Sequence, residues 1–193
     1  MILRLARFDD LPALNALIAD SGIALSRGFY GDAQAEAMSR QVYGADTRLI
    51  ADGTYYAIDG GEAIAACGGW SKRGTLFGSD HAKAHGHGHG HSDASSEEDP
   101  MLDPATDAAR IRAFFVSPHF ARRGLGSQLM RHCAAEAWAA GFRRLTLVST
   151  LPGEPLYASF GFTVDDRFEL ALDGGLHVPL ACMSRELSRP NLD

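Results

Sequence analysis

A short loop rich in arginine and glycine is the stretch of this sequence whose residue types best suit ligand binding. It reads Ala121-Arg122-Arg123-Gly124-Leu125-Gly126 and is followed by Ser127. An apolar stretch at 111–116 precedes the loop and predicts a strand, and an alanine-rich stretch at 127–140 follows it and predicts a helix. The first N–H groups of a helix lack partners within it and carry partial positive charge, and glycines let a ligand approach the backbone closely. The pattern therefore predicts a phosphate or pyrophosphate site.

The elements around this loop indicate an α/β fold of the layered α+β kind. Hairpin signals stand at Asp59-Gly60-Gly61 and Asp173-Gly174-Gly175. Only one strand–helix–strand unit is evident, so we expect a mixed, mostly antiparallel central sheet flanked by helices. The expected strands are 2–7, 54–58, 63–70, 111–116, 145–148, 162–164, 168–172 and 177–183. The expected helices are one that begins at Asp9 or Asp10 and ends at Ser21-Gly22, then 32–42, 127–140 and 154–160.

The bulk composition bounds the class of protein. A length of 193 residues predicts one domain over 1–193, with a net charge of -6 at pH 7. Six of the acidic residues lie in 78–105 beside a single lysine, so the rest of the chain is nearly neutral. The absence of a basic face argues against nucleic acid as a partner. We expect Cys67, Cys133 and Cys182 to be free buried thiols. With no signal-peptide pattern and no long apolar run, we expect a cytoplasmic protein that does not bind membranes.

A histidine-rich segment interrupts this otherwise ordinary sequence. Within the low-complexity stretch at about 78–105, alternate histidines and glycines place imidazoles on one side of an extended chain, at His81, His85, His87, His89 and His91. Imidazole suits zinc, nickel and copper. The segment offers no scaffold that would fix a coordination geometry, so we expect a loop that binds divalent metal only adventitiously.

A second motif stands one predicted helix and one predicted strand after the loop, and it reads Tyr157-Ala158-Ser159-Phe160-Gly161-Phe162. Together with Val116-Ser117-Pro118 and the arginine–glycine loop, it resembles the GNAT superfamily of acyl-CoA-dependent N-acetyltransferases. That family has a strand ending in V-x-P, then [QR]-x-x-G-x-[GA], and later Y-x-x-x-G-F. The resemblance covers 110–164 well and the remainder in outline. Ala121 departs from the family, because it stands at the Gln/Arg position.

The resemblance implies a ligand for the loop. The amides of residues 122–127, with charge from Arg122 or Arg123, would hold the pyrophosphate of coenzyme A. The pantetheine arm would lie between the strands at 110–116 and 145–149, paired with backbone groups near Phe115 and Val116. Tyr157 would be the general acid for the departing thiolate. Two structural alternatives stay open: the arginines form a solvated pair, and Tyr157 only packs its helix on the sheet.

The implied reaction is transfer of an acetyl group from acetyl-CoA to an amine of a small molecule or peptide, by direct attack. The family builds its acceptor pocket from the early helices, which here points to Arg27, Tyr30 and Trp70, although these side chains could equally belong to the core. No residue of the sequence stands out as the general base. The alternative reading is a non-catalytic acyl-CoA sensor or metal-binding protein that keeps the fold. Many relatives dimerise, so a homodimer is a further expectation.

Overall fold

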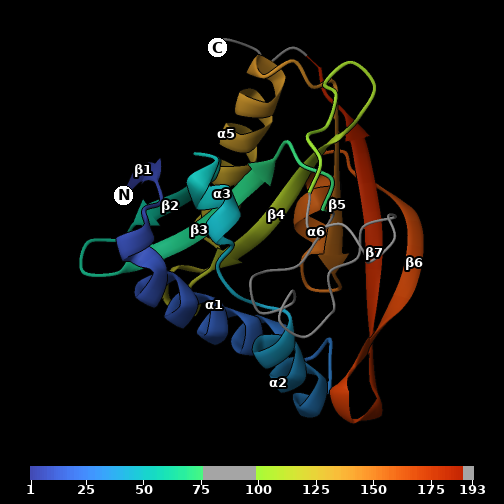
Figure 1. Cartoon of the computed structure of the whole chain (residues 1–193). Coiled ribbons are helices and arrows are strands. Elements are labelled where there is room, and N and C mark those ends of the chain that lie inside the picture. The colour runs from blue at the N-terminus through green and yellow to red at the C-terminus, as the bar shows by residue number, and fades with distance from the viewer. Residues whose placement is uncertain (76–98, 189–193) are drawn as a thin grey trace.

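A seven-stranded sheet organises the chain, as seen in the computed structural model (Figure 1), which describes residues 1–75 and 99–188. The strand order is β1-β2-β3-β4-β5-β7-β6. Every neighbouring pair is antiparallel except β4 and β5, which are parallel. The expected mixed, mostly antiparallel sheet flanked by helices is therefore confirmed.

The elements follow the predicted order closely. The strands are β1 (Ile2–Leu5), β2 (Tyr55–Asp59), β3 (Ile64–Ser71), β4 (Ala109–Val116), β5 (Arg144–Thr150), β6 (Thr163–Leu172) and β7 (Leu176–Glu186). The helices are α1 (Leu11–Ser26), α2 (Asp32–Gln41), α3 (Thr47–Ala51), α5 (Leu125–Ala139) and α6 (Glu154–Ser159). Single 3-10 turns lie at η1 (Phe8–Asp10), η2 (Pro118–Phe120) and η3 (Asp173–Gly175).

Helices cover both faces of the sheet (Figure 1). On one face, α1 packs over β2 and β3, and α2 packs over the β6–β7 ribbon. On the other face, the alanine-rich α5 packs on the centre of the sheet, with residues of α6 beside it. Strand β3 is buried along its full length, as its small apolar residues predict for an interior strand.

The first helix is longer than expected. The prediction that Ser21-Gly22 ends it is wrong, since α1 continues to Ser26. The ring of Tyr43 explains the glycine, because a Cβ at Gly22 would lie 2.5 Å from Tyr43 Cδ2. Gly22 therefore serves close packing between α1 and the chain after α2. A sequence alone does not distinguish a glycine that allows close packing from a glycine that ends a helix.

Other boundaries also differ from the prediction. Helix α5 begins at Leu125, two residues before the expected Ser127. The stretches predicted as separate strands at 162–164 and 168–172 form the single strand β6, with a register shift between Val164 and Asp166. The short helix α3 was not predicted, since five residues are too few for a visible apolar period.

The expected histidine-rich loop leaves and rejoins the described chain at one place. The N–H of Gly74 donates to the carbonyl of Pro100 at 2.9 Å, and the N–H of Thr75 donates to Asp99 Oδ1 at 2.7 Å. The five histidines of this segment lie outside the described residues. Within 1–75 and 99–188, no group of three or more histidine, cysteine or acidic side chains could hold a metal ion. None of the helices described there is long and apolar enough to cross a membrane.

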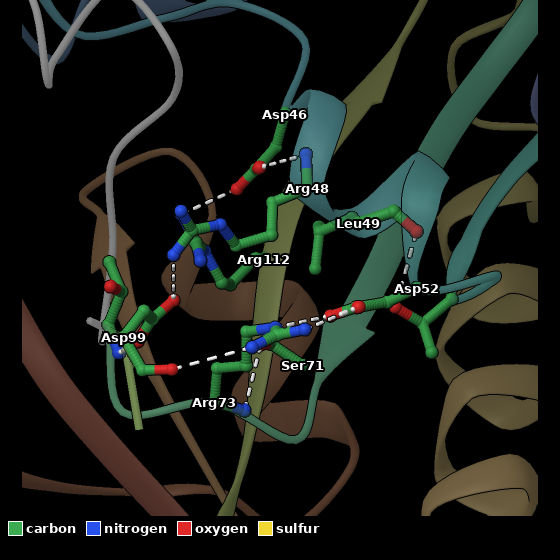
Figure 2. A network of polar contacts seen from close by, with 10 residues as sticks. Asp46, Arg48, Leu49, Asp52, Ser71, Arg73, Asp99 and Arg112 are labelled. Carbon is green, nitrogen blue, oxygen red and sulfur yellow. Dashed lines mark hydrogen bonds and ion pairs between the residues drawn. The ribbon is translucent and has the colours of Figure 1, made fainter. Parts of the chain in front are cut away.

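A buried ion pair joins α3 to the centre of the sheet (Figure 2). Arg112 Nη2 lies 2.6 Å from Asp46 Oδ2, and the two side chains are 2% and 0% exposed. The other Asp46 oxygen accepts the N–H of Arg48 at 3.0 Å and so caps α3. Nearby, Arg73 makes a two-pronged bond to Asp52, with distances of 2.7 and 2.8 Å. The ion pair between Arg112 and Asp46 thus ties β4 to the start of α3.

We predict that Asp46→Asn costs about 3 kcal/mol of unfolding free energy, because it leaves a buried guanidinium without its carboxylate. Urea denaturation measures this change. Arg40→Gln is the matched control, since Arg40 faces Glu36 across an exposed pair at 3.8 Å, and its removal should change stability by less than about 0.5 kcal/mol. Equal losses of unfolding free energy in the two variants would contradict the conclusion that the buried pair contributes more than the exposed one.

Candidate functional site

The parallel strands β4 and β5 separate shortly after they begin. Their pairing consists of Ala109 with Leu145 and Arg110 with Thr146. Beyond this point β5 stays paired with β7 as far as Thr150, while β4 stays paired with β3. The facing edges of β4 and β5 therefore hold backbone groups without a strand partner, which an extended ligand can bond as an added strand would.

A bulge in β4 accompanies this separation. Gly69 pairs with Arg112 and Cys67 pairs with Phe115, so that Gly68 alone faces two residues of β4. One of those two is Ala113, whose φ of 55° is in the left-handed region. A residue with a side chain adopts this conformation at a cost of roughly 1 kcal/mol, so the bend has to be supported by its surroundings.

A cavity opens where the strands part. Its walls come from the end of α2, the bulged part of β4, the end of β5 and the start of α6. They are mostly apolar, and the described lining residues include no carboxylate and no imidazole. The lining residues are Met38, Val42, Tyr43, Gly44, Ile111, Arg112, Ala113, Phe114, Phe115, Val148, Thr150, Gly153, Tyr157 and Leu180.

The backbone of β4 alternates in direction along this cavity. The N–H of Ser117 donates to the carbonyl of Ala65 on β3 at 2.9 Å. Because successive residues of a strand point their N–H groups to opposite edges, the N–H of Val116 is directed away from β3, toward the open side. The N–H of Phe115 is directed toward Cys67 on β3. The ring of Phe115 lies against Tyr43 with a centroid separation of 5.2 Å, so Phe115 contributes a side-chain wall.

The arginine–glycine loop forms the entrance to α5. Arg122 and Gly124 both have left-handed backbones, with φ of 63° and 79°. The first bond of the helical ladder runs from the N–H of Gln128 to the carbonyl of Gly124. The N–H groups of Leu125, Gly126 and Ser127 therefore precede that ladder, at the positive end of the helix. A turn of left-handed residues before a helix makes a concave set of N–H groups that suits an anion.

The two arginines of the loop are exposed but have different surroundings. The guanidinium of Arg123 lies over the ring of Phe120, 5.3 Å from its centroid. Arg122 has no ion pair with a described residue, and it is the better placed of the two to meet an anion on the loop. Gly126 serves contact with α6, because a Cβ there would lie 3.1 Å from Leu156 Cδ2. Ala121 is the residue after η2 and has an ordinary extended backbone.

Tyr157 stands on α6 at the edge of the cavity. Its ring packs edge-on against Phe114 and Phe162, with centroid separations of 6.4 and 5.9 Å. The phenol carries its proton at neutral pH, and burial raises its pKa above the usual value, so it also resists deprotonation in alkaline solution. The hydroxyl makes no hydrogen bond to a described residue, and it is therefore available to a ligand.

The three residues expected to bind an acceptor do not line this cavity in the described part of the chain. The Tyr30 hydroxyl donates to the carbonyl of Pro179 at 2.9 Å and accepts the N–H of Leu151 at 2.8 Å. Trp70 is 5% exposed and packs against Phe142 in the core under α5. Arg27 is exposed at the end of α1, in a shallow hollow that it shares with His119.

Sequence reasoning missed several cavity residues, notably Met38, Val42, Tyr43 and Arg112. The helix that carries Met38 was predicted, but its alanine-rich pattern does not reveal which face meets β7. Arg112 stands between Ile111 and Ala113 in β4, and nothing in the adjacent residues indicates that its side chain is buried. The carboxylate of Glu154, on α6, accepts two hydrogen bonds of 2.7 and 2.8 Å from Arg167, and this partner lowers the pKa of the carboxyl.

Comparisons with known proteins bear on this site. The model of the acetyltransferase (GNAT) family matches residues 24–162. Among solved structures, the chain is similar to a GCN5-related N-acetyltransferase of Rhodopseudomonas palustris, with 16% identity, a TM-score of 0.67 and coverage of 96% of this chain and 95% of that one. The PaiA N-acetyltransferase of Thermoplasma acidophilum, in complex with coenzyme A, is 12% identical, with a TM-score of 0.62 and coverage of 96% and 98%.

The yncA protein of Salmonella typhimurium, solved with its cofactor acetyl-CoA, is 15% identical, with a TM-score of 0.57 and coverage of 100% of this chain and 97% of that one. No curated protein sequence matches the chain. At these identities the structural likeness concerns the fold, and the match over 24–162 concerns the family.

The two bonds of the Tyr30 hydroxyl predict a structural role that stability can test. Tyr30→Phe should lower the unfolding free energy by about 1–2 kcal/mol, since it leaves a backbone donor and a backbone acceptor without their partner. Tyr157→Phe is the matched control, because that hydroxyl has no described partner, and it should change stability by less than about 0.5 kcal/mol. Denaturant unfolding of both variants measures this difference. An unchanged unfolding free energy in Tyr30→Phe would contradict the structural role of the Tyr30 hydroxyl.

Proposed function

Because this chain belongs to the GNAT family of acetyltransferases, we propose that it transfers the acetyl group of acetyl-CoA to an amine of a small molecule or peptide. The family match confirms the resemblance carried by the two motifs, and the protein is an acyltransferase with acetyl-CoA as its donor. What supports the finer proposal is that three features of the chain suit the same donor: the N–H groups at the start of α5, the gap between β4 and β5, and Tyr157 at the edge of the cavity.

The residues present fit the donor along its length. The pyrophosphate binds the N–H groups of residues 122–127, with Arg122 supplying a charge-assisted contact. The pantetheine arm lies in the gap between β4 and β5, where the N–H and C=O of Val116 point away from β3 and bond its amides as a neighbouring strand would. The ring of Phe115 bounds the same passage.

The chemistry takes place at the inner end of the gap. A neutral amine attacks the thioester carbonyl, the C–N bond forms, and the carbonyl oxygen gains negative charge. Backbone N–H groups of β4 at the bulge face this oxygen and stabilise the charge. The C–S bond then breaks and the nitrogen loses a proton to solvent, which yields the N-acetyl amine, while the sulfur departs as a thiolate that is protonated to the thiol of coenzyme A.

Tyr157 acts as the general acid for this departing thiolate. Its phenol carries a proton at neutral pH, and burial raises its pKa further, so the proton is also retained in alkaline solution. The proton passes from the phenol to the sulfur as the C–S bond breaks, and solvent restores it. No lining residue of the described cavity can serve as a carboxylate or imidazole base, so the amine has to reach the thioester in its neutral form.

The acceptor side of the cavity favours an acceptor that carries an apolar group next to its amine. Met38, Val42 and Leu180 form this wall, and Tyr43 adds an aromatic ring. Among the described lining residues the single charged group is Arg112, which is paired with Asp46. A pocket without acidic side chains gives no advantage to acceptors with several positive charges.

The direct test combines the protein with acetyl-CoA and a panel of primary amines that differ in apolar character. Release of free thiol and appearance of the N-acetyl product by mass spectrometry should both occur, fastest with apolar monoamines. Binding of coenzyme A without turnover on any amine would instead indicate a non-catalytic acyl-CoA sensor.

We predict that Tyr157→Phe lowers kcat by about 100-fold, as expected for loss of a general acid. The dissociation constant of coenzyme A should change less than twofold, because the loop at α5 is intact. The wild-type rate should not fall as the pH rises to 10, the ordinary value for tyrosine, since the raised pKa keeps this acid protonated there. Retention of wild-type kcat in Tyr157→Phe would remove the catalytic role.

We also predict that Arg122→Ala weakens the binding of coenzyme A by about tenfold, the size of one charge-assisted contact. Arg123→Ala, whose guanidinium lies over Phe120, should have a smaller effect. Calorimetric titrations of each variant with coenzyme A and with pantetheine, which lacks the pyrophosphate, measure these changes. A loss seen equally with pantetheine would show that Arg122 acts elsewhere than on the phosphates.

A further inference from the structure

Tyr55 spans three strands beneath the cavity. It stands on β2, is 0% exposed, and pairs with Gly69 of β3, which in turn pairs with Arg112 of β4. Its ring passes over Gly69 to reach β4. A Cβ at Gly69 would lie 2.8 Å from Tyr55 Cδ2 and 2.5 Å from the carbonyl oxygen of Thr54. Only glycine at position 69 leaves this path open.

The Tyr55 hydroxyl meets two groups at the far end of this path. It lies 3.2 Å from the carbonyl oxygen of Ala113 and 3.3 Å from the Sγ of Cys67. A hydroxyl has one proton to donate, and a carbonyl oxygen is a better acceptor than a thiol sulfur. The phenol therefore donates to Ala113, and the Cys67 thiol can donate to the phenolic oxygen. Burial raises the pKa of this thiol to about 12, so its proton is retained.

The residue whose carbonyl is held is the strained one. Ala113 has its φ of 55° at the bulge, and a fixed hydrogen bond to its carbonyl opposes relaxation of that peptide. The neighbouring glycine serves the other face of the sheet. A Cβ at Gly68 would lie 2.6 Å from Phe114 Cδ2, so the glycine makes room for that ring. The pair Gly68-Gly69 thus accommodates one aromatic ring on each side of the bulge.

The orientation of this peptide decides where its N–H points. The described chain contains no cis peptide bond, and in a trans peptide the C=O and the following N–H point in opposite directions. The carbonyl of Ala113 points to the Tyr55 hydroxyl, so the N–H of Phe114 points away from that hydroxyl. At this part of β4 the edge that has no strand partner is the one that β5 leaves open. Both residues line the cavity.

We propose that Tyr55 is a positioning residue for acetyl transfer: its hydroxyl holds the carbonyl of Ala113 and so directs the N–H of Phe114 at the thioester carbonyl. This inference rests on the proposed function, and it names the group that orients the oxyanion donor. Tyr55 touches neither the donor nor the acceptor. Its effect passes through one peptide unit, and the loss of its hydroxyl leaves the binding loop at α5 unchanged.

The test measures the polarisation of the thioester directly. Acetyl-CoA labelled with 13C at the acetyl carbonyl is bound to the protein, and isotope-edited infrared difference spectra give the carbonyl stretching frequency. We expect a shift to lower frequency in the wild type, because a hydrogen bond weakens the C=O bond. In Tyr55→Phe this shift should shrink, and kcat per coenzyme A binding site should fall by about tenfold or more, part of the loss seen when an oxyanion donor is removed.

Tyr56→Phe is the matched control, since it removes a hydroxyl from the next residue of the same strand. Tyr56 is 5% exposed and lies on the opposite face, against His132. It should keep the full infrared shift and the wild-type kcat. If Tyr55→Phe does not fold, the comparison is made between Ala113→Gly and Tyr55→Phe/Ala113→Gly, since glycine at position 113 relieves the left-handed backbone and stabilises both.

The outcomes separate the two proposals. A wild-type protein that fails to bind acetyl-CoA contradicts the proposed function itself. Binding without a carbonyl shift, or an equal shift in Tyr55→Phe and Tyr56→Phe, contradicts only the positioning role. If kcat of Tyr55→Phe falls only in proportion to the fraction of the protein that is folded, the positioning role is likewise contradicted and Tyr55 serves stability alone.

Discussion

The separation of two parallel strands is the constraint on which this structure depends. After Ala109 and Arg110, β4 and β5 no longer pair, although each keeps its other neighbour. Unpaired backbone groups inside a protein are costly, so such a gap persists only where a ligand or solvent satisfies them. In the proposed function this gap is the passage that binds the donor, and it offers backbone groups rather than special side chains.

Keeping the gap open places demands on the surrounding strands. The bulge in β4 forces Ala113 into a left-handed backbone, and the glycines at 68 and 69 give up side-chain packing so that Phe114 and Tyr55 can fit. The ion pair between Arg112 and Asp46 holds the strand immediately before the bulge (Figure 2). A buried ion pair is weak evidence for stability but holds a definite position. Here that position is the wall of the cavity.

The two ends of the passage differ in their electrostatics. At the outer end, Arg122 and the start of α5 present positive charge and free N–H groups to solvent. At the inner end, the phenol of Tyr157 is neutral and burial raises its pKa further, and the walls are mostly apolar. This division suits a donor that is anionic at one end and reactive at the other.

How much of this was visible in the sequence depends on how local each feature is. The arginine–glycine loop, the helix it begins and the Tyr157 motif were predicted, because a helix N-terminus and a short turn are specified by adjacent residues. The pattern of strands also indicated the sheet. The expectation for Tyr30, Trp70 and Arg27 as acceptor residues stays untested, and none of them lines the described cavity.

The sequence by itself thus determined the arginine–glycine loop at the start of a helix, the sheet and the family. Only the tertiary structure decided which side chains share a cavity, since Tyr43, Arg112 and Leu180 are brought together by contacts between distant strands and helices. Only the tertiary structure revealed that Gly69 serves Tyr55, because the two residues meet through strand pairing. Spacing along a chain specifies local backbone geometry, whereas the packing of side chains from distant segments depends on the whole fold.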